Sequence, residues 1–396
     1  MLIALTGKPS VGKSSFYRAA TLASAEVANY PFTTIKSAEA TAYVKIDCVD
    51  KDFNTQCNPR MGYCIDHNRF IPVRLMDVPG LIPGAHKGEG LGNLFLDDLN
   101  QADALIHVID ISGSTNEKGE PVTAGSYDPS QDIKFLENEL DQWYLRIIKN
   151  GWNKFIRQTK AEGGELYKAI AKQLSGLRVT ETIAKETLNE LQFSNNLETW
   201  SEKEVEKLAS TLRSKTKPMI IAANKVDVSC GMDNLVRLRK EYPDYTIIPC
   251  SAESELALKE AAKKEMIHYI PGEKEVKITG NLNEGQKNAI EFIDKNILQV
   301  FDNTGVQKVM DTVAFEVLNL IAIFPGGVNN LTDKDGNVIP DCFLIKKGST
   351  ALDFAFKLHT DIGKGFIRAI DVKTKRTVGK DHELKHRDVI EIITRA

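Results

Sequence analysis

A glycine-rich segment near residue 10 has the residue types and spacing that bind phosphate. Residues 7–14 read Gly-Lys-Pro-Ser-Val-Gly-Lys-Ser, match the pattern G-x-x-x-x-G-K-S, and lie between an apolar run and a helical pattern. Backbone N–H groups of such a loop and the N-terminus of the following helix form an anion cradle. We therefore expect Lys13 to reach the β- and γ-phosphates of a nucleotide, Ser14 to bind Mg²⁺ and Ser15 to contact the α-phosphate. The residues predicted to bind the nucleotide here are Gly7, Lys8, Pro9, Ser10, Val11, Gly12, Lys13, Ser14 and Ser15.

A second segment, Asp-Val-Pro-Gly at 77–80, follows an apolar run and extends this phosphate chemistry. The Asp77 carboxylate can hold Mg²⁺ through water, and the Gly80 N–H can sense a γ-phosphate. The expected reaction is attack of water on that phosphate, with Lys13, Mg²⁺ and backbone amides stabilising the developing charge.

Two later segments predict which base is bound. Asn224, Lys225 and Asp227 form Asn-Lys-x-Asp after an apolar run, and Ser251-Ala252 follows another. The Asp227 carboxylate can accept hydrogen bonds from guanine N1–H and the exocyclic amine, and the Ala252 N–H can meet guanine O6. Adenine lacks that donor pair and would leave the carboxylate unpaired, so the pattern favours GTP.

The sequence that carries these motifs resembles the Obg superfamily of GTPases. Residues 29–34, Asn-Tyr-Pro-Phe-Thr-Thr, and residues 77–92, from Asp-Val-Pro-Gly to Gly-Leu-Gly, look like its two switch regions. The long helical insertion and the position of the phosphate loop at the start resemble the YchF branch. The end of the chain, from Thr377 to Ile393, looks like the TGS domain of DRG and YchF GTPases. The resemblance implies that Thr34 closes on Mg²⁺ and the γ-phosphate.

The chain departs from the family pattern at two positions. YchF proteins often lack the guanine-reading aspartate and prefer ATP, whereas this chain keeps Asp227, so we expect GTP; a YchF-type ATPase is the alternative. Many potassium-activated relatives carry Asn where this chain has Ser10, which leaves potassium dependence open.

The residue after the Asp-x-x-Gly segment predicts slow hydrolysis. Leu81 stands where many small GTPases place a water-orienting glutamine, and leucine cannot polarise water. His86 is the nearest candidate for that role, with a solvent-exposed switch histidine as the alternative. The residues expected to take part in catalysis are Lys13, Thr34, Gly80 and His86, and the metal ligands are Ser14 and Thr34. A nucleotide sensor that binds without hydrolysing is a further alternative.

The expected partner is the ribosome or RNA, because TGS domains recur in translation-linked proteins. Residues 144–160 hold five basic residues, no acidic residue and three aromatic residues, a composition that suits RNA phosphates and base stacking. Basic residues also solvate helices and aromatic residues usually belong to a core, and we favour that interpretation for this segment alone.

Four metal-binding side chains lie close together in sequence. Cys48, Cys57, Cys64 and His67 form C-x8-C-x6-C-x2-H and could make a tetrahedral zinc site. The spacing does not match the common C-x2-C knuckle, so thiols in a hairpin are the favoured interpretation.

The elements that position these residues are short apolar strands alternating with helices. Apolar runs at 2–6, 70–76, 104–109, 218–223 and 246–249 predict an α/β, mostly parallel sheet covered on both faces, the P-loop NTPase arrangement. The helical seam from Ile133 to Ile147, with Val205, Leu208 and Leu212, predicts an inserted hairpin or coiled-coil arm; helices lying on the sheet are the alternative. After residue 319 the pattern indicates a small β-grasp domain. The predicted divisions are 1–127 and 218–319 for the G domain, 128–217 for the insertion and 320–396 for the TGS domain.

Composition limits the setting and the partners. Of 396 residues, 42% are hydrophobic and 27% charged, an ordinary globular balance, and the formal charge is 51 − 54 = −3. No apolar run approaches the ~18 residues that span a bilayer, so no membrane partner is expected. No global positive field attracts DNA. Six cysteines without an export signal fit a reducing cytoplasm.

Overall fold

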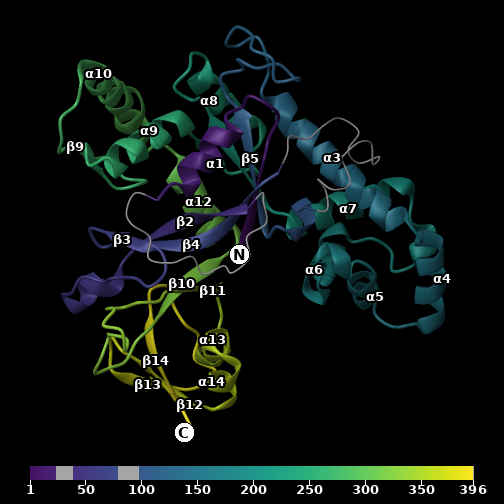
Figure 1. Ribbon diagram of the computed structural model, residues 1–396. Helices are drawn as coiled ribbons and strands as arrows, with labels where there is room; N and C mark the ends of the chain where they lie inside the picture. Colours follow the sequence, from purple (N-terminus) through teal and green to yellow (C-terminus); the bar gives the residue numbers. More distant parts are fainter. Residues whose placement is uncertain (24–38, 79–97, 396) are drawn as a thin grey trace. The chain divides into compact units, whose positions relative to one another are not determined.

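The computed structural model describes residues 1–23, 39–78 and 98–395, and its contacts divide the chain into two compact units. The first unit contains Met1–Lys13 and Met76–Cys250, and the second contains Ser14–Leu75 and Ser251–Ala396. Figure 1 shows the ribbon with most of its helices and strands labelled.

A parallel sheet forms the centre of the first unit. Its strands run in the order β1 (Leu2–Thr6), β5 (Ala104–Asp110), β6 (Met219–Asn224) and β7 (Ile247–Pro249). Every residue of β1, β5 and β6 is buried. Parallel strands covered on both faces must be apolar throughout, which is why uninterrupted Ile, Leu, Val and Ala runs form them. The predicted parallel α/β sheet is confirmed, and the strands' carboxyl ends meet at one edge.

Helices of the first unit surround and extend from this sheet. The bounds are α3 (Ser130–Lys149), α4 (Trp152–Glu162), α5 (Leu166–Gln173), η3 (Ser175–Leu177), α6 (Glu181–Leu191), η4 (Leu197–Thr199), α7 (Glu202–Thr216) and α8 (Gly231–Glu241). α3 is 20 residues long, but among the helices of the described ranges none has the length and apolar character needed to cross a membrane.

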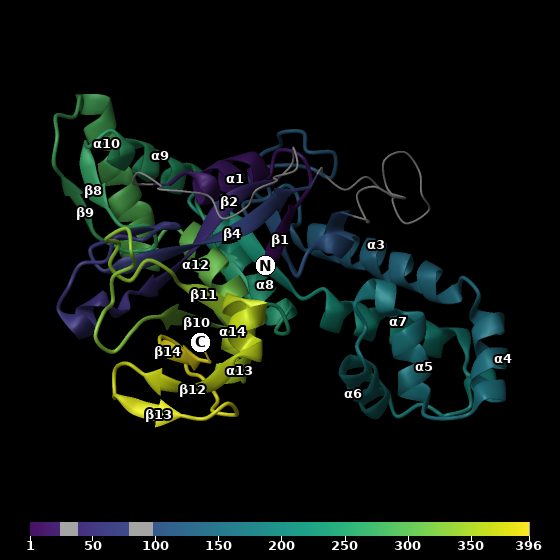
Figure 2. The ribbon, with the colours of Figure 1, turned by 60° about the horizontal axis from the view of Figure 1, so that its bottom comes forward.

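The segment 128–217 combines the two arrangements that its sequence leaves open. α3 and α7 lie side by side, α4 lies at the end of α3 farthest from β1, and α6 packs against both α5 and α7 (Figure 2). Leu136 and Leu140 of α3 and Leu208 of α7 share one buried cluster with Leu2 and Leu105 of the strands. The apolar seams therefore join the helices to each other and to the sheet. A capping box at Ser201, as its sequence predicts, begins α7.

The second unit contains the remaining elements before residue 320. They are α1 (Lys13–Thr21), β2 (Glu39–Asp47), η1 (Val49–Phe53), β3 (Tyr63–Ile65), β4 (Asn68–Asp77), α9 (Ala252–Lys263), β8 (Ile267–Tyr269), β9 (Val276–Ile278), α10 (Glu284–Ile293), η5 (Asp294–Leu298), α11 (Gln299–Phe301), α12 (Val306–Thr312) and η6 (Val313–Val317). α1 starts at the last residue of the first unit, and β4 ends with two residues of that unit, Met76 and Asp77. β3 and β4 form an antiparallel hairpin, with β2 beside β4.

Residues after 319 form a separate five-stranded sheet with two short helices, drawn in green to yellow in Figure 1. The strand order is β11-β10-β14-β12-β13, with β10 (Leu320–Pro325), β11 (Phe343–Lys346), β12 (Phe366–Asp371), β13 (Arg376–Val378) and β14 (Val389–Thr394), and the helices are α13 (Ala351–Leu358) and α14 (Thr360–Lys364). The predicted capping box at Thr350 begins α13, whose buried face rests on the sheet through Phe354. Strands, a helix and further strands in this order are the β-grasp arrangement expected from the sequence.

Candidate nucleotide-binding site

The glycine-rich loop joins β1 to α1 and has a backbone that only glycine can adopt at one key position. Gly12 has φ +89°, and a Cβ there would lie 2.2 Å from Nδ2 of Asn224. That amide is fixed because it donates to the backbone oxygen of Val11 at 2.8 Å. The loop and the end of β6 are therefore held together within the first unit, and Gly12 allows their close approach.

An ion pair lies at the end of the loop. Lys13 Nζ is 2.5 Å from Oδ1 of Asp77, the last residue of β4, and their side chains are 14% and 30% exposed. The sequence-predicted phosphate lysine and acidic residue are thus brought together. A partly exposed carboxylate oxygen suits Mg²⁺, which prefers oxygen ligands and keeps several waters, and the adjacent ammonium suits the phosphates that such an ion accompanies.

The Asn-Lys-x-Asp segment follows β6 at the same edge of the sheet. Lys225 adopts φ +63°, and its Nζ lies 2.9 Å from Oδ2 of Asp110 at the end of β5. The Val226 N–H donates to the Cys250 oxygen at 3.2 Å. Asp227 is half-buried. The segment is therefore braced on both sides, while the carboxylate predicted to recognise guanine remains accessible.

Asp110 organises the loop that begins at residue 112, a role that sequence reasoning missed. Its carboxylate is fully buried and accepts hydrogen bonds from the hydroxyls of Ser112 at 2.5 Å, Ser114 at 2.8 Å and Thr115 at 3.0 Å. Burial opposes its ionisation, but the Ser112 hydroxyl and the Lys225 ammonium lower the pKa of Asp110. The available signal was an aspartate at the end of an apolar strand, the same position that Asp77 occupies.

Lys8 has its side chain engaged away from the cradle. Its Nζ lies 2.9 Å from Oδ2 of Asp132 on α3, donates to the Thr115 oxygen at 3.0 Å and stands 3.6 Å above the Tyr127 ring. Burial lowers the pKa of Lys8, and Asp132 opposes that shift. Only the backbone of this predicted phosphate-binding residue is left for a nucleotide, and the side chain instead fixes the loop against α3.

The second unit holds the other predicted residues that are described. Ser15 on α1 donates from Oγ to Oε1 of Glu253 in the first turn of α9, at 2.5 Å. Ser251 donates its N–H to the Thr304 oxygen at 2.9 Å. Ala252 begins α9. Ser14 and Ser15, predicted to bind Mg²⁺ and phosphate, thus lie on α1. The Ser15 side chain contacts α9, the helix that begins at Ala252 of the predicted guanine segment.

Four predicted residues lie outside the described ranges. Thr34, Gly80, Leu81 and His86 fall within 24–38 and 79–97, so the structure describes none of their geometry.

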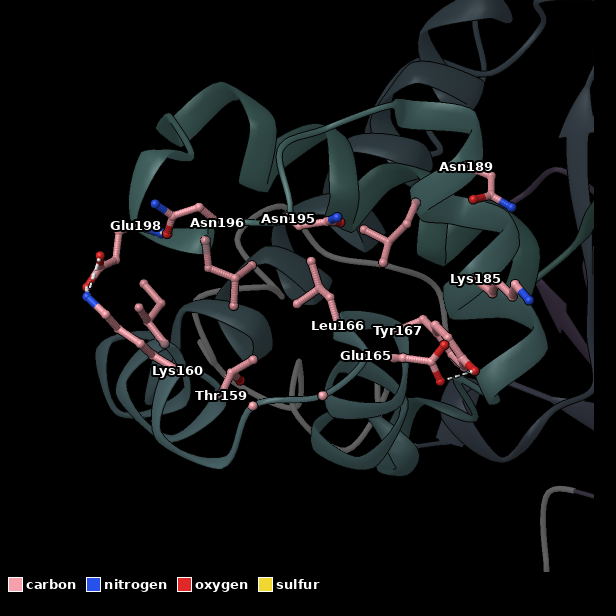
Figure 3. Close-up of a pocket in the computed structure, with 15 residues that line it drawn as sticks. Thr159, Lys160, Glu165, Leu166, Tyr167, Lys185, Asn189, Asn195, Asn196 and Glu198 are labelled. Atoms are coloured by element: carbon pink, nitrogen blue, oxygen red, sulfur yellow. Dashed lines mark hydrogen bonds and ion pairs between the residues drawn. The ribbon is translucent and has the colours of Figure 1, made fainter.

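A separate pocket of about 700 Å³ lies among α4, α5 and α6. Figure 3 shows Lys160 and Glu198 on one side and Tyr167, Glu165 and Lys185 on the other. Lys160 pairs with Glu198 at 2.9 Å, and the Tyr167 hydroxyl donates to Glu165 at 2.8 Å. Lys160 and Glu198 thus pair with each other and Glu165 pairs with Lys168, whereas the phosphate loop motifs lie elsewhere in this unit.

The basic and aromatic segment 144–160 adopts the structural arrangement that we favoured from its sequence. Tyr144 and Phe155 are buried in the first unit's core, and Trp152 packs against it. Among the basic residues, Lys149 pairs with Glu202 and Lys160 with Glu198. Its aromatic rings are therefore committed to packing rather than to stacking on bases.

Comparison with known protein families identifies this fold. Residues 2–146 match the family model described as a 50S ribosome-binding GTPase, residues 222–328 match an Obg-like GTPase YGR210-like, G4 motif-containing domain, and residues 328–394 match a TGS domain. The molecule therefore has a P-loop G domain and a C-terminal TGS domain.

Similar proteins extend over the whole chain. A GTP-binding protein of Methanocaldococcus jannaschii is 46% identical over 396 residues, covering 100% of this chain and 99% of the relative. The ribosome-binding ATPase YchF of Mycoplasma genitalium is 30% identical over 375 residues, covering 92% and 86%. The crystal structure of a GTP-binding protein from Pyrococcus horikoshii OT3 matches with a TM-score of 0.79, 37% identity and full coverage of both chains. The chain belongs to the YchF/Obg-like family of GTP-binding proteins.

Proposed function

We propose that this protein hydrolyses GTP to GDP and phosphate as a Mg²⁺-dependent molecular switch. The observation that carries the proposal is the link between the two motifs, in which Asn224 of Asn-Lys-x-Asp donates to Val11 of the phosphate loop. A single site that binds the phosphates and recognises the base of one nucleotide requires a fixed distance between the phosphate loop and the Asn-Lys-x-Asp segment. The relatives named GTP-binding proteins support the same assignment.

The phosphate loop and its neighbours bind the triphosphate. Backbone N–H groups of the loop face the phosphates, and Lys13 moves from Asp77 to the β- and γ-phosphates. Ser14 and Thr34 would hold Mg²⁺, and the Asp77 carboxylate would support the ion. The ion, when bound, neutralises charge on the phosphate oxygens. Gly80 senses the γ-phosphate through its N–H.

Asp227 provides the preference for guanine. Its carboxylate accepts from N1–H and the exocyclic amine, Ala252 donates its N–H to O6, and Ser251 holds that segment in place. The alternative is an ATPase, which the names of the YchF protein of Mycoplasma genitalium and of Obg-like ATPase 1 of Rattus norvegicus support. Those relatives are 30% and 26% identical. Retention of Asp227 is the residue-level argument for GTP.

Hydrolysis is slow without a partner, because Leu81 cannot orient water. His86 supplies that function when the partner is bound. The partner is the ribosome or RNA, supported by the family model described as ribosome-binding and by the name of the Mycoplasma relative. The domain divisions proposed are 1–127 and 218–319 for the G domain, 128–217 for the insertion and 320–396 for the TGS domain, and the protein acts in the cytoplasm.

The test is nucleotide binding followed by single-turnover phosphate release. The full chain should bind GTP more tightly than ATP in the presence of Mg²⁺, and ribosomes should accelerate release of phosphate from bound GTP. Lys13→Ala should abolish turnover, and His86→Ala should lower only the stimulated rate. Preference for ATP would contradict the guanine assignment. Binding without release in either condition would favour the nucleotide sensor instead.

A further inference from the structure

Three cysteines converge beside a buried carboxylate in the second unit. Cys48 follows β2, Cys57 lies in the loop after η1, and Cys64 is on β3. Their sulfur atoms and one carboxylate oxygen of Asp50 all lie within 4.8 Å of one another. The sulfur atoms of Cys48 and Cys57 are 3.5 Å apart. Tetrahedral zinc with Zn–S bonds of about 2.3 Å separates its sulfur ligands by about 3.8 Å, so the cluster already has nearly those dimensions.

The charge and burial of this cluster favour a cation at its centre. Cys48 and Asp50 are fully buried, and Cys57 is 4% exposed. A buried carboxylate surrounded by thiols is costly unless positive charge compensates it. The guanidinium of Arg69 supplies one positive charge, with Nη1 3.6 Å from the Cys57 sulfur. Three thiolates and a carboxylate would carry four negative charges, which a divalent ion together with Arg69 largely neutralises.

Outer contacts hold the ligands in place as they do in metal sites. His67 Nδ1 lies 3.0 Å from Oδ1 of Asp50, and the Cys57 N–H donates to Oδ2 at 3.1 Å. Hydrogen bonds from a second layer commonly orient metal ligands. The ligand set thus differs from the one suggested by the spacing C-x8-C-x6-C-x2-H, because Asp50 takes the fourth place and His67 supports it.

The surrounding loop buries few side chains of its own, and its other contacts include polar ones from Asn58 and Arg60 to residues 337–341. Between residues 51 and 62, only Cys57 and Gly62 are buried. A segment of this length without an apolar anchor loses much conformational entropy on ordering, and metal binding can provide the compensating free energy. Cys57 provides the one buried side chain of this loop, so a metal ion bound by Cys57 would fix the loop to the cluster.

We propose that Cys48, Cys57, Cys64 and Asp50 bind one structural Zn²⁺ ion that fastens the loop between η1 and β3. Four protein ligands close the coordination sphere, so the site leaves no position for a substrate or an activating water. The geometry thereby replaces the interpretation of these residues as hairpin thiols. The proposal is independent of nucleotide binding, since none of these residues belongs to the nucleotide motifs.

The test is metal uptake by the full chain. Reduced and metal-free protein is titrated with Co²⁺, which reports tetrahedral thiolate coordination by visible absorption and a sulfur-to-cobalt charge-transfer band. We expect one Co²⁺ per chain, displaced by one Zn²⁺. Absence of that band, or a disulfide between these cysteines in protein purified under reducing conditions, would overturn the proposal.

Matched variants assign the ligands. Cys57→Ser and Cys64→Ser should each lose the tetrahedral spectrum, whereas Cys250→Ser, which alters a buried cysteine outside the cluster, should retain it. Circular dichroism checks that each variant folds. The wild-type spectrum tests the proposal even where a variant does not fold.

Variants of Asp50 and His67 show which of these two residues is the fourth ligand. Asp50→Ala should lose the tetrahedral cobalt spectrum. His67→Ala should keep it and lower the Zn²⁺ affinity about 10–100-fold, the usual effect of removing a supporting contact. The reverse result, with the spectrum lost in His67→Ala and kept in Asp50→Ala, would overturn this ligand set.

Discussion

At the scale of single residues, the proposed preference for guanine depends on Asp227. Replacing it by Asn keeps the size but turns part of the acceptor into a donor facing the guanine N–H groups. Hydrogen bonds to a charged group contribute about 1.5–3 kcal/mol, so Asp227→Asn should weaken GTP binding about 10–100-fold and leave ATP binding nearly unchanged. Titration calorimetry with both nucleotides measures this. Equal losses for both would indicate that the residue supports the fold rather than recognising the base.

A second residue, His107 in β5, should give the protein a specific pH dependence. Burial, with a smaller contribution from Lys8, lowers the pKa of His107 to about 3, against about 6.5 in an unfolded chain. The unfolded state therefore binds the proton first as pH falls, so stability is complete above pH ~6.5 and is lost progressively toward pH ~3. Between pH 8 and pH 5 the loss should be about 2 kcal/mol.

The variant His107→Leu isolates that contribution. Urea unfolding of both chains at pH 8 and pH 5 should show the wild type losing about 2 kcal/mol more than the variant on acidification. Other acidic groups titrate equally in both proteins and cancel in the comparison. A difference between the two chains that does not change with pH would show that His107 does not titrate as its burial implies.

At the scale of elements, the carboxyl ends of the strands determine where the site lies. β1 leads into the phosphate loop, β5 ends at Asp110 and β6 ends at Asn224, so residues over 200 positions apart share one edge of a parallel sheet. This placement follows from strand order rather than from any local preference of the loops.

The coupling between the phosphate loop and α3 can be measured through the buried pair Lys8 and Asp132. Both side chains are under 9% exposed. Removing one partner leaves an uncompensated buried charge, so Lys8→Met and Asp132→Asn should each lower the free energy of unfolding by about 3–5 kcal/mol. The double variant should lose less than the sum of the two. Strict additivity in denaturant unfolding would show that the two groups do not interact.

The sequence predicted the elements that have a strong repeating pattern and missed those shaped by distant contacts. Apolar runs located β1, β5 and β6 within a residue or two, because parallel strands buried on both faces need nothing else. β2 was missed although the apolar residues Ala40, Ala42, Val44 and Ile46 alternate along it and were available as a signal. The π-helical turns η5 and η6 have no sequence pattern of their own.

The site was predictable to the same extent. The spacing of the motifs predicted that Lys13 and Asn224 lie at the phosphate loop, because the two motifs that contain them bind the phosphates and the base of one nucleotide. It could not show that the Lys8 ammonium binds Asp132 or that Asp110 gathers three hydroxyls. Those contacts depend on where the loop at 112–127 folds back, which no local spacing encodes.

At the scale of the whole molecule, the net charge of −3 gives no general attraction for nucleic acid. The proposed association with a ribosome would then depend on specific surfaces and on the nucleotide state. A switch of this kind requires that the nucleotide itself stabilise the chain, because ordering by a γ-phosphate is the source of its two states.

Ligand-dependent stability tests that requirement. At a GTP concentration 100 times its Kd, binding should add about 2.7 kcal/mol to the free energy of unfolding of the binding unit, seen as a rise in its melting temperature. Mg²⁺ should be omitted rather than chelated, because a chelator would also remove Zn²⁺ from the cysteine cluster and confuse the two effects. Without Mg²⁺ the stabilisation by GTP should shrink, since the phosphates lose their counter-ion. Lys13→Ala should remove most of it, and a melting temperature that GTP raises equally in Lys13→Ala would place the bound nucleotide somewhere other than the phosphate loop.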